Sequence, residues 1–184
     1  MAGLPHYSSS QASINKFEPV FLNQFEVVIT PPSAVAGGDL LLEHVRSVGG
    51  FALDKTPVPI EQKYKFAKRN YAGAKPNNTF MDLSLDFNVN LNNSNSMYVF
   101  KTLRQWTDLI YNPLTGAQGL KVDYTGTIVI SIFNKQGDVF RRVTCRDCFP
   151  TKPITSMELN YTADGLYKIE GMTWAVDYWE DLFL

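Results

Sequence analysis

Strict alternation of hydrophobic and polar side chains over residues 80–91 is the clearest pattern in the chain. In the segment FMDLSLDFNVNL, apolar residues occupy every odd position from 81 to 91, and polar residues occupy the even positions between them. Successive side chains of a β-strand point to opposite faces, so this alternation predicts a long strand that is buried on one face only. The polar face of this predicted strand consists of Asp82, Ser84, Asp86, Asn88 and Asn90.

The hydrophobic period changes directly after this strand. Apolar residues now recur at steps of four, three and four, which places them on one face of a helix. Asn and Ser residues at 93–96 can cap its first turn, and Asn112-Pro113 ends it. The pattern therefore predicts one helix over about residues 95–111, packed on the sheets through its apolar face. That face consists of Val99, Leu103, Trp106 and Ile110.

Other parts of the chain also carry strand signals, separated by turn residues. The predicted strands cover 19–29, 40–48, 127–133, 138–149, 157–162 and 166–179, and residues 114–125 are expected to form a connecting loop. Two hairpin turns are predicted, at NKQG (134–137) and at Ala163-Asp164-Gly165. Many strands with one helix after the longest strand predict a mainly β protein. We expect a two-sheet sandwich or barrel-like domain with one packed α-helix.

The length of 184 residues predicts one globular domain. Residues 1–17 are small and polar without a period, so we expect an N-terminal arm that is disordered or ordered only by a neighbour. Residues 18–184 are then a single β domain. Within it, residues at about 57–78 begin with strand-like alternation and end in Gly, Pro and Asn, which is typical of a hairpin arm or a long loop.

The charge balance argues against a protein dedicated to gripping nucleic acid. Seventeen Lys and Arg against eighteen Asp and Glu give a net charge of −1, whereas such binders carry a basic excess. A passive conduit would need little attraction to phosphate. The first residues carry no apolar signal region, and no run of apolar residues could span a bilayer. We therefore expect no membrane insertion and folding in a reducing cytoplasm.

The chain offers few groups for catalysis. It has two histidines, His6 and His44, and no G-x-S-x-G motif. Cys145 and Cys148 have the C-x-x-C spacing of a redox pair or of half a zinc site, but no second ligand pair accompanies them. They also lie within a strand-like run and not at a helix start, which favours two structural thiols. We expect no catalytic residue, cofactor or metal, and therefore no enzyme.

A basic cluster and an aromatic C-terminus are the candidate contact surfaces. Lys63, Lys65, Lys68 and Arg69 alternate with aromatic residues, which fits a nucleic-acid patch, a solvated loop or an arm that docks on an acidic neighbour. Acidic residues for such docking occur at 177–181. Past the last predicted strand, Trp179 and Phe183 continue the apolar pattern, which favours a subunit interface. We predict inter-subunit or inter-ring contacts for Lys63, Lys65, Lys68, Arg69, Trp179 and Phe183.

The polar face of the long strand has an unusual composition. Its five side chains are small and hydrophilic, and none is a lysine. Such a face suits a water-filled bore that repels DNA weakly, and it also fits an ordinary exposed sheet face. We predict that it lines a lumen.

The segment 137–180 resembles the C-terminal half of the tail tube proteins of contractile-tailed phages. The resemblance rests on the Phe149-Pro150 step, on the Ser-Met-Glu-Leu strand at 156–159, and on MTWAVDYW at 172–179. The spacing N-x-F-x-V-x-I at 23–29 resembles the first strand of these proteins, and the helix with Arg104 and Trp106 stands where they have their single helix.

The resemblance implies a two-sheet, barrel-like subunit that forms hexameric rings stacked head to tail around a channel for DNA. It further implies a place in the virion as tail tube after assembly in the host cytoplasm. The implied partners are the tail sheath protein, the baseplate and the tail terminator, while DNA passes through without specific binding. The same fold serves the tube protein of type VI secretion and of other contractile injection systems, whose cargo is protein.

Overall fold

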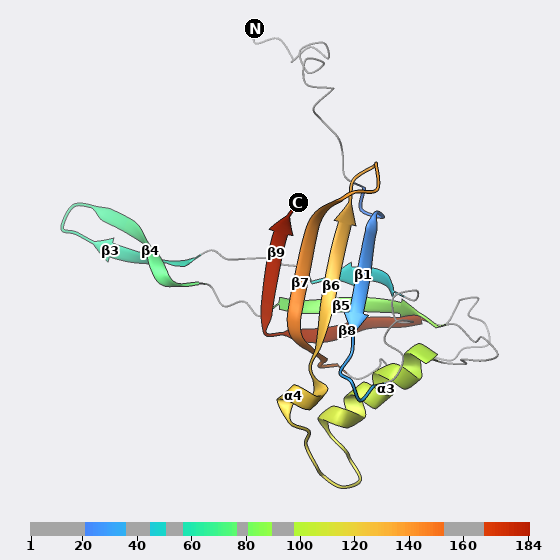
Figure 1. Cartoon of the computed structure of the whole chain (residues 1–184). Helices are drawn as coiled ribbons and strands as arrows, with labels where there is room; N and C mark the ends of the chain where they lie inside the picture. The colour runs from blue at the N-terminus through green and yellow to red at the C-terminus, as the bar shows by residue number, and fades with distance from the viewer. Residues whose placement is uncertain (1–20, 36–44, 51–56, 77–80, 90–97, 153–167) are drawn as a thin grey trace, which may run out of the picture.

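β-strands make up most of the residues that the computed structural model describes, and seven of these strands form two layers (Figure 1). The structure describes residues 21–35, 45–50, 57–76, 81–89, 98–152 and 168–184. One layer has the order β1-β6-β7-β9 and the other the order β2-β5-β8, with antiparallel pairing throughout. The first layer comprises β1 (Phe25–Thr30), β6 (Gly126–Phe133), β7 (Val139–Pro150) and β9 (Tyr178–Phe183). The second comprises β2 (Val45–Gly49), β5 (Met81–Asn88) and β8 (Lys168–Val176).

The two layers are parts of one continuous sheet. Phe149 and Pro150 at the end of β7 pair with Ala175 and Trp174 of β8, so β7 passes from the first layer into the second. The strands β5 and β8 run crosswise behind the first layer (Figure 1). The prediction of a mainly β, two-sheet fold with one packed helix is therefore confirmed.

The core lies between the layers and follows the alternation of the sequence. Leu83, Leu85 and Phe87 of β5 are completely buried. Val27 and Ile29 of β1 face them from the other layer and are also buried. Each face that turns inward thus carries the apolar half of an alternating strand, which is the physical reason for the two-layer arrangement.

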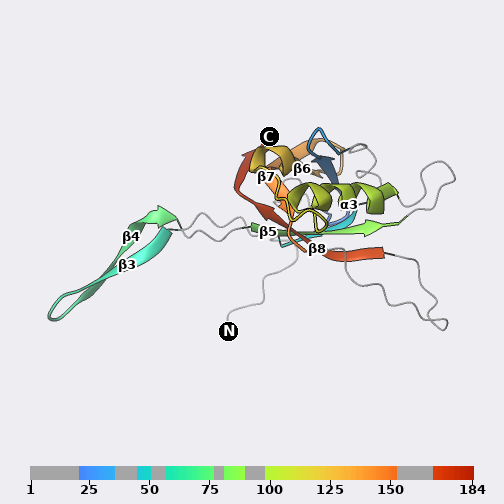
Figure 2. The same cartoon turned by 90° about the horizontal axis from the view of Figure 1, so that it is seen from below.

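Helix α3 (Tyr98–Ile110) packs against this core (Figure 2). Val99, Leu103 and Trp106 are buried, and Ile110 at the end of the helix is half-buried. The Trp106 ring meets the Trp174 ring edge to face, with 4.9 Å between the ring centroids. Three of the four residues of the predicted helix face are therefore in the core, while at the end of the helix Leu109 packs on the core. The predicted capping residues at 93–96 lie outside the described residues.

Two predictions at the boundaries of elements are wrong. The first strand begins at Phe25 and not near residue 19, because the Gln24 N–H donates to the Phe21 carbonyl at 3.2 Å and closes a turn. The segment 114–125 is not only a loop, since it ends in the short helix α4 (Lys121–Tyr124). The Trp106 Nε1–H donates to the Tyr124 carbonyl at 2.6 Å and fastens this turn to α3.

The single strand predicted over 166–179 is also wrong. β8 ends at Val176 in the second layer, and β9 starts at Tyr178 in the first. Continued alternation would bury Tyr178, but its side chain is exposed and Trp179 packs on the core instead. The alternation therefore shifts by one residue at Asp177, where the chain changes layer. The predicted strand 157–162 lies outside the described residues.

Candidate assembly surfaces

The polar face of β5 lies on the side of the second layer that is turned away from the core. Ser84 and Asp86 are half-buried and Asn88 is exposed, in alternation with the buried apolar side chains of the strand. For Asp82 only the backbone is described, and Asn90 lies outside the described residues. Three of the five residues predicted to line a lumen thus share one described face, and their place in a lumen stays a prediction.

Charges from neighbouring strands join this face. The Arg46 Nη1 of β2 lies 3.6 Å from the Glu170 Oε1 of β8, and the Lys168 Nζ lies 4.0 Å from the same oxygen. With Asp86, the described part of the face carries two positive and two negative groups. The outward face as a whole is therefore not free of basic residues, although β5 has no lysine on it. Strand pairing brings Arg46 and Lys168 onto this face. The sequence pattern of one strand could not reveal this balance.

Asp86 serves the fold as well as the surface. The Gly171 N–H donates to Asp86 Oδ1 at 2.7 Å, and the Ser47 hydroxyl donates to Oδ2. The register of β5 against β8 shifts here, with one extra residue in β8, and Gly171 adopts a φ of 65°. Such a bulge frees a backbone N–H from the ladder. Asp86 accepts that N–H and ties all three strands of the second layer together.

The basic cluster forms a hairpin of β3 (Pro57–Lys63) and β4 (Lys68–Pro76), which projects away from the two layers (Figures 1 and 2). The two strands form a separate two-stranded sheet. Its turn closes through the Tyr64 N–H, which donates to the Ala67 carbonyl at 2.7 Å. An isolated two-stranded hairpin is marginally stable in water. This one also exposes five large apolar side chains: Val58, Ile60, Tyr64, Phe66 and Tyr71.

The charges of the hairpin are partly paired within it. The carboxylate of Glu61 binds Lys68 and lies 3.7 Å from the Lys63 Nζ. The Lys65 Nζ lies 5.4 Å from the centroid of the Phe66 ring, and the Arg69 guanidinium lies 5.8 Å from that of the Tyr64 ring. Among the hairpin side chains that the structure describes, Lys65 and Arg69 are therefore the cations most available to a partner.

The acidic C-terminal residues have partners within the chain. Asp177 binds Lys121, and Glu180 Oε2 lies 3.4 Å from Arg146 Nη2. Asp181 receives two hydrogen bonds from one guanidinium, Arg141 Nε to Oδ1 at 3.0 Å and Nη2 to Oδ2 at 2.9 Å. These hydrogen bonds raise the pKa of Arg141. These carboxylates are therefore paired within the chain, and their contact with the hairpin of a neighbour stays a prediction.

The two C-terminal aromatic residues predicted at an interface differ in environment. Trp179 is half-buried and packs on the core, whereas the side chain of Phe183 is exposed. The Arg141 guanidinium lies 5.1 Å from the centroid of the Phe183 ring. Only Phe183 is thus presented to a partner by the single chain, and the interface role of both residues stays a prediction.

Cys145 and Cys148 are both completely buried on β7. Residues three apart on a regular strand face opposite sides, but the pairing of β6 with β7 contains a bulge here, with Asp147 at a φ of 54°. A hydrogen bond to Cys145, together with burial, raises the pKa of Cys148, and the same hydrogen bond lowers the pKa of Cys145. Within the described ranges no group of three metal-ligating side chains is found.

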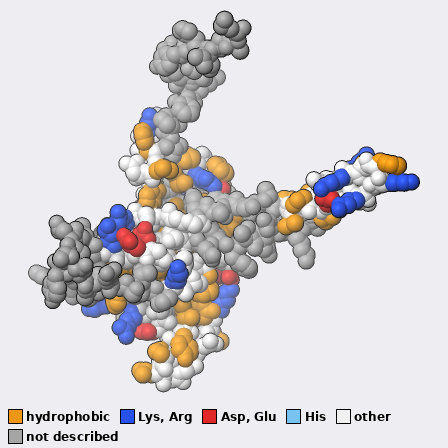
Figure 3. Space-filling view, turned by 180° about the vertical axis from the view of Figure 1, so that it is seen from behind, with side chains coloured by type: hydrophobic (Ala, Val, Ile, Leu, Met, Phe, Trp, Pro, Cys, Tyr) orange, Lys and Arg blue, Asp and Glu red, His pale blue; other side chains and the backbone are white. Residues whose placement is uncertain are grey.

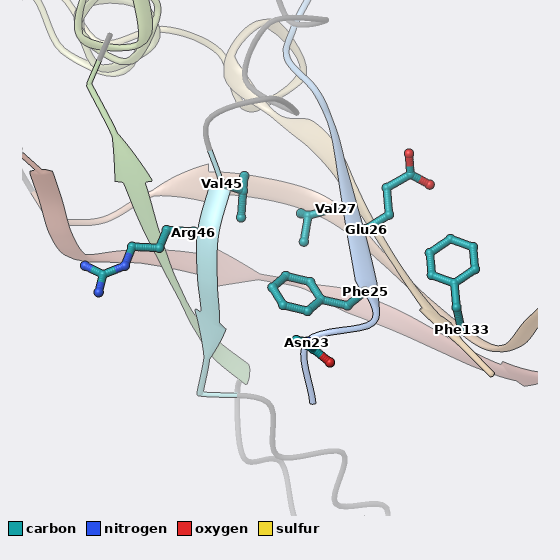
Figure 4. Close-up of a pocket in the computed structure, with 7 residues that line it drawn as sticks. All are labelled: Asn23, Phe25, Glu26, Val27, Val45, Arg46 and Phe133. Carbon is teal, nitrogen blue, oxygen red and sulfur yellow. The ribbon is translucent and has the colours of Figure 1, made fainter. Parts of the chain in front are cut away.

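Two hollows open between the layers in the part of the chain that the structure describes. A cleft of 680 Å³ lies beside β1 and β2, where Phe25, Val27 and Val45 stand close together and Glu26 and Arg46 point away to opposite sides (Figure 4). A second hollow of 390 Å³ is lined mostly by apolar side chains, among them Phe21 and Leu22. Neither lining combines a nucleophile with a base, so neither hollow is a candidate active site. Both are openings at the edge of the sandwich.

One apolar surface was missed by the sequence analysis. Tyr111, Leu114, Leu120 and Val122 are all exposed on the segment 111–122, which runs from the end of α3 into α4 and is named the α3–α4 connector. Figure 3 shows hydrophobic side chains gathered at this end of the molecule. The sequence does contain four large apolar residues in this Gly-containing segment. They recur with neither the helical nor the strand period, so the pattern predicts no buried or exposed face for them.

Solved structures of contractile injection systems have the same architecture. The tube-terminating cap of the anti-feeding prophage matches with a TM-score of 0.61 and 16% identity, over 91% of this chain and 93% of that chain. A chain of the PVC sheath–tube complex matches with a TM-score of 0.57 and 18% identity, over 97% and 100%. The chain has the tail-tube fold. The PVC sheath/tube terminator agrees, with a TM-score of 0.57 and 17% identity over 90% and 98%.

The likeness to the tail-tube fold extends over nearly the whole chain. No protein-family model and no curated protein matches the sequence. At these identities the likeness is one of fold. None of the described helices is long and apolar enough to cross a membrane.

Proposed function

We propose that the chain is the structural subunit of the inner tube of a contractile tail or injection device, which stacks as rings around a channel. The observation that carries this proposal is the likeness in fold to a chain of a sheath–tube complex over 97% of this chain and 100% of that chain. The strands β1, β2 and β9 also end their layers without a further described strand beside them. Pairing between subunits would remove such edges, which are otherwise prone to aggregation.

The proposed device is a contractile phage tail, with hexameric rings and a channel for DNA in the virion. The alternative is the tube of a type VI secretion system or another contractile injection system, with protein as cargo. The matched structures belong to extracellular contractile injection systems and share 17% and 18% identity with this chain, so they support the tube fold without separating the two devices. The balanced charge on the outward face of the second layer is compatible with either cargo, because it would neither hold nor strongly repel phosphate.

In this proposal, the outward face of the second layer lines the channel through Ser84, Asp86 and Asn88. The hairpin and Phe183 contact neighbouring subunits. The matched solved structures include a sheath–tube complex, a terminator and a baseplate. We therefore propose a sheath, a terminator and a baseplate as the partners of this chain.

A second candidate is the ring that ends the tube. The cap of the anti-feeding prophage and the PVC terminator both match this chain with TM-scores above 0.5. A main tube subunit must bind copies of itself at both ends of the ring, whereas a cap binds its own kind only within the ring.

Negative-stain electron microscopy over a concentration series separates these functions. Stacked tubes of constant diameter support the main tube subunit, and single rings that never stack support the cap. A monodisperse monomer at every concentration, also in the presence of its sheath and baseplate proteins, refutes both.

Within tubes, Asn88→Lys tests the channel face, with Asn88→Asp as the matched control. If Asn88 faces the channel, the lysine variant retains single-stranded DNA in a salt-dependent way and the aspartate variant does not. Equal behaviour of the two variants would remove Asn88 from the channel.

A further inference from the structure

The exposed apolar face of the hairpin needs a partner that the described chain does not supply. Its side chains at 57–72 are all exposed, including Val58, Ile60 and Phe66. The hairpin carries five Lys and Arg residues against one Glu, a formal charge of +4. Its strands would extend about 30 Å from base to tip at roughly 3.3 Å per residue. A matching surface must therefore be apolar and acidic, and it can belong to another molecule.

The connector between α3 and α4 has the complementary character. Leu114, Leu120 and Val122 are exposed there, at 95%, 70% and 77%. The exposed carboxylates Asp108 and Asp123 flank these residues in the chain. Lys121, the basic residue of α4, is already bound to Asp177. Among the described residues no ion pair of Asp108 or Asp123 is found, so two negative groups lie next to the exposed apolar residues in the chain.

We propose that the hairpin of one copy docks on the α3–α4 connector of a second copy. This inference rests on the proposed function only in requiring self-association. The hairpin and the connector are different surfaces, so the contact is heterologous and can either close into a ring or extend as a chain. Phe66 would lie on the apolar centre of the connector, while Lys65 and Arg69 approach Asp108 and Asp123. Lys68 and Lys63 stay with Glu61.

A nucleic acid fits the hairpin less well. Lys68 is held by Glu61. The exposed aliphatic side chains of Val58 and Ile60 offer nothing to phosphate, but they match an apolar protein surface.

Site-directed crosslinking between two copies tests the contact. A Phe66→Cys protein is mixed with a Val122→Cys protein, and a short bismaleimide joins the two new thiols. The native cysteines are completely buried and are not expected to react. We expect a crosslinked dimer from this mixture. The matched control pairs Phe66→Cys with Lys135→Cys, which lies in the exposed turn between β6 and β7, and should give none.

A charge swap shows whether the contact is specific. Lys65→Glu with Arg69→Glu should reduce the crosslink yield about tenfold or more at low salt, since like charges then face each other. Adding Asp108→Lys and Asp123→Lys to the Val122→Cys partner should restore the yield. Lys135→Glu with Lys152→Glu, which reverses two exposed charges outside the hairpin, serves as the control and should leave the crosslink yield unchanged.

The outcomes separate this inference from the proposed function. Tubes or rings without the crosslink overturn the docking site and leave the tube function standing. A crosslink that the charge swap restores supports the docking site even where only short oligomers form. Absence of both crosslink and assembly overturns both. Loss of the crosslink together with salt-dependent binding of a single-stranded oligonucleotide that Lys65→Glu/Arg69→Glu abolishes would assign the hairpin to nucleic acid instead.

Discussion

Replacement of Asp86 by alanine should destabilise the second layer. The carboxylate accepts hydrogen bonds from the Gly171 N–H, at 2.7 Å, and from the Ser47 hydroxyl. Hydrogen bonds to a charged group contribute roughly 1.5–3 kcal/mol each. Water can reach part of this half-buried site and replace some of the loss. We therefore expect Asp86→Ala to lower the free energy of unfolding by about 2–3 kcal/mol.

Asp86→Asn distinguishes the geometry of this group from its charge. The amide oxygen can still accept the Gly171 N–H, and the Ser47 hydroxyl can rotate to accept a hydrogen bond from the amide nitrogen. We expect a loss of about 1 kcal/mol or less, because no buried donor is left unsatisfied. Asn88→Ala, on the same face of the same strand, is the control for a surface substitution and should cost less than about 0.5 kcal/mol.

Urea unfolding and thermal melting measure these differences. For a chain of this size, a loss of 2–3 kcal/mol corresponds to a drop in Tm of roughly 5–10 °C. If Asp86→Ala were as stable as Asn88→Ala, Asp86 would not support the bulge at Gly171. It would then be a surface charge only. The result also decides which variants can test the channel, since a lysine at position 86 would disturb the fold together with the charge.

Three further predictions concern the core. Trp106→Phe should lower the free energy of unfolding, measured in urea, by about 2–4 kcal/mol, because it opens a cavity and leaves the Tyr124 carbonyl without its donor. A loss below about 0.5 kcal/mol would refute the tight packing of Trp106. Gly126→Ala should cost more than about 2 kcal/mol, since a Cβ would lie 2.7 Å from the Trp106 ring and 2.5 Å from a backbone oxygen, and an unchanged Tm would contradict this. The hydrogen bond to Cys145 and burial raise the pKa of Cys148, so the native thiol keeps its proton while the unfolded thiol ionises above about pH 8.5. The stability from this group is thus complete below about pH 8.5 and declines as pH rises. Cys148→Ala alone would also remove the hydrogen bond that lowers the pKa of Cys145. The advantage of the unsubstituted protein over Cys145→Ala/Cys148→Ala should therefore shrink between about pH 8.5 and 10, and a constant difference would exclude the raised pKa of Cys148.

The thiols also give a direct kinetic test. Cys145 and Cys148 should not react with a soluble disulfide reagent in the native protein and should react fully in urea. Rapid labelling of either thiol without denaturant would contradict their burial.

The sequence by itself determined the elements whose side chains repeat with a regular period. The alternation around Leu83, Leu85 and Phe87 placed β5, and the spacing of Val99, Leu103 and Trp106 placed α3 and its buried face. These patterns are local because a strand or a helix buries one face whatever lies opposite. The mainly β, two-layer fold with one packed helix followed from their order.

Only the tertiary structure decided which residues meet across strands. The balance of Arg46, Lys168 and Glu170 with Asp86 depends on register, and register is fixed by bulges that leave no mark in a single strand. The shift at Asp177, which turns one predicted strand into β8 and β9, arises because the chain passes between layers there. The pairing of the C-terminal carboxylates within the chain, and the exposure of the α3–α4 connector, likewise depend on contacts between segments far apart in the sequence.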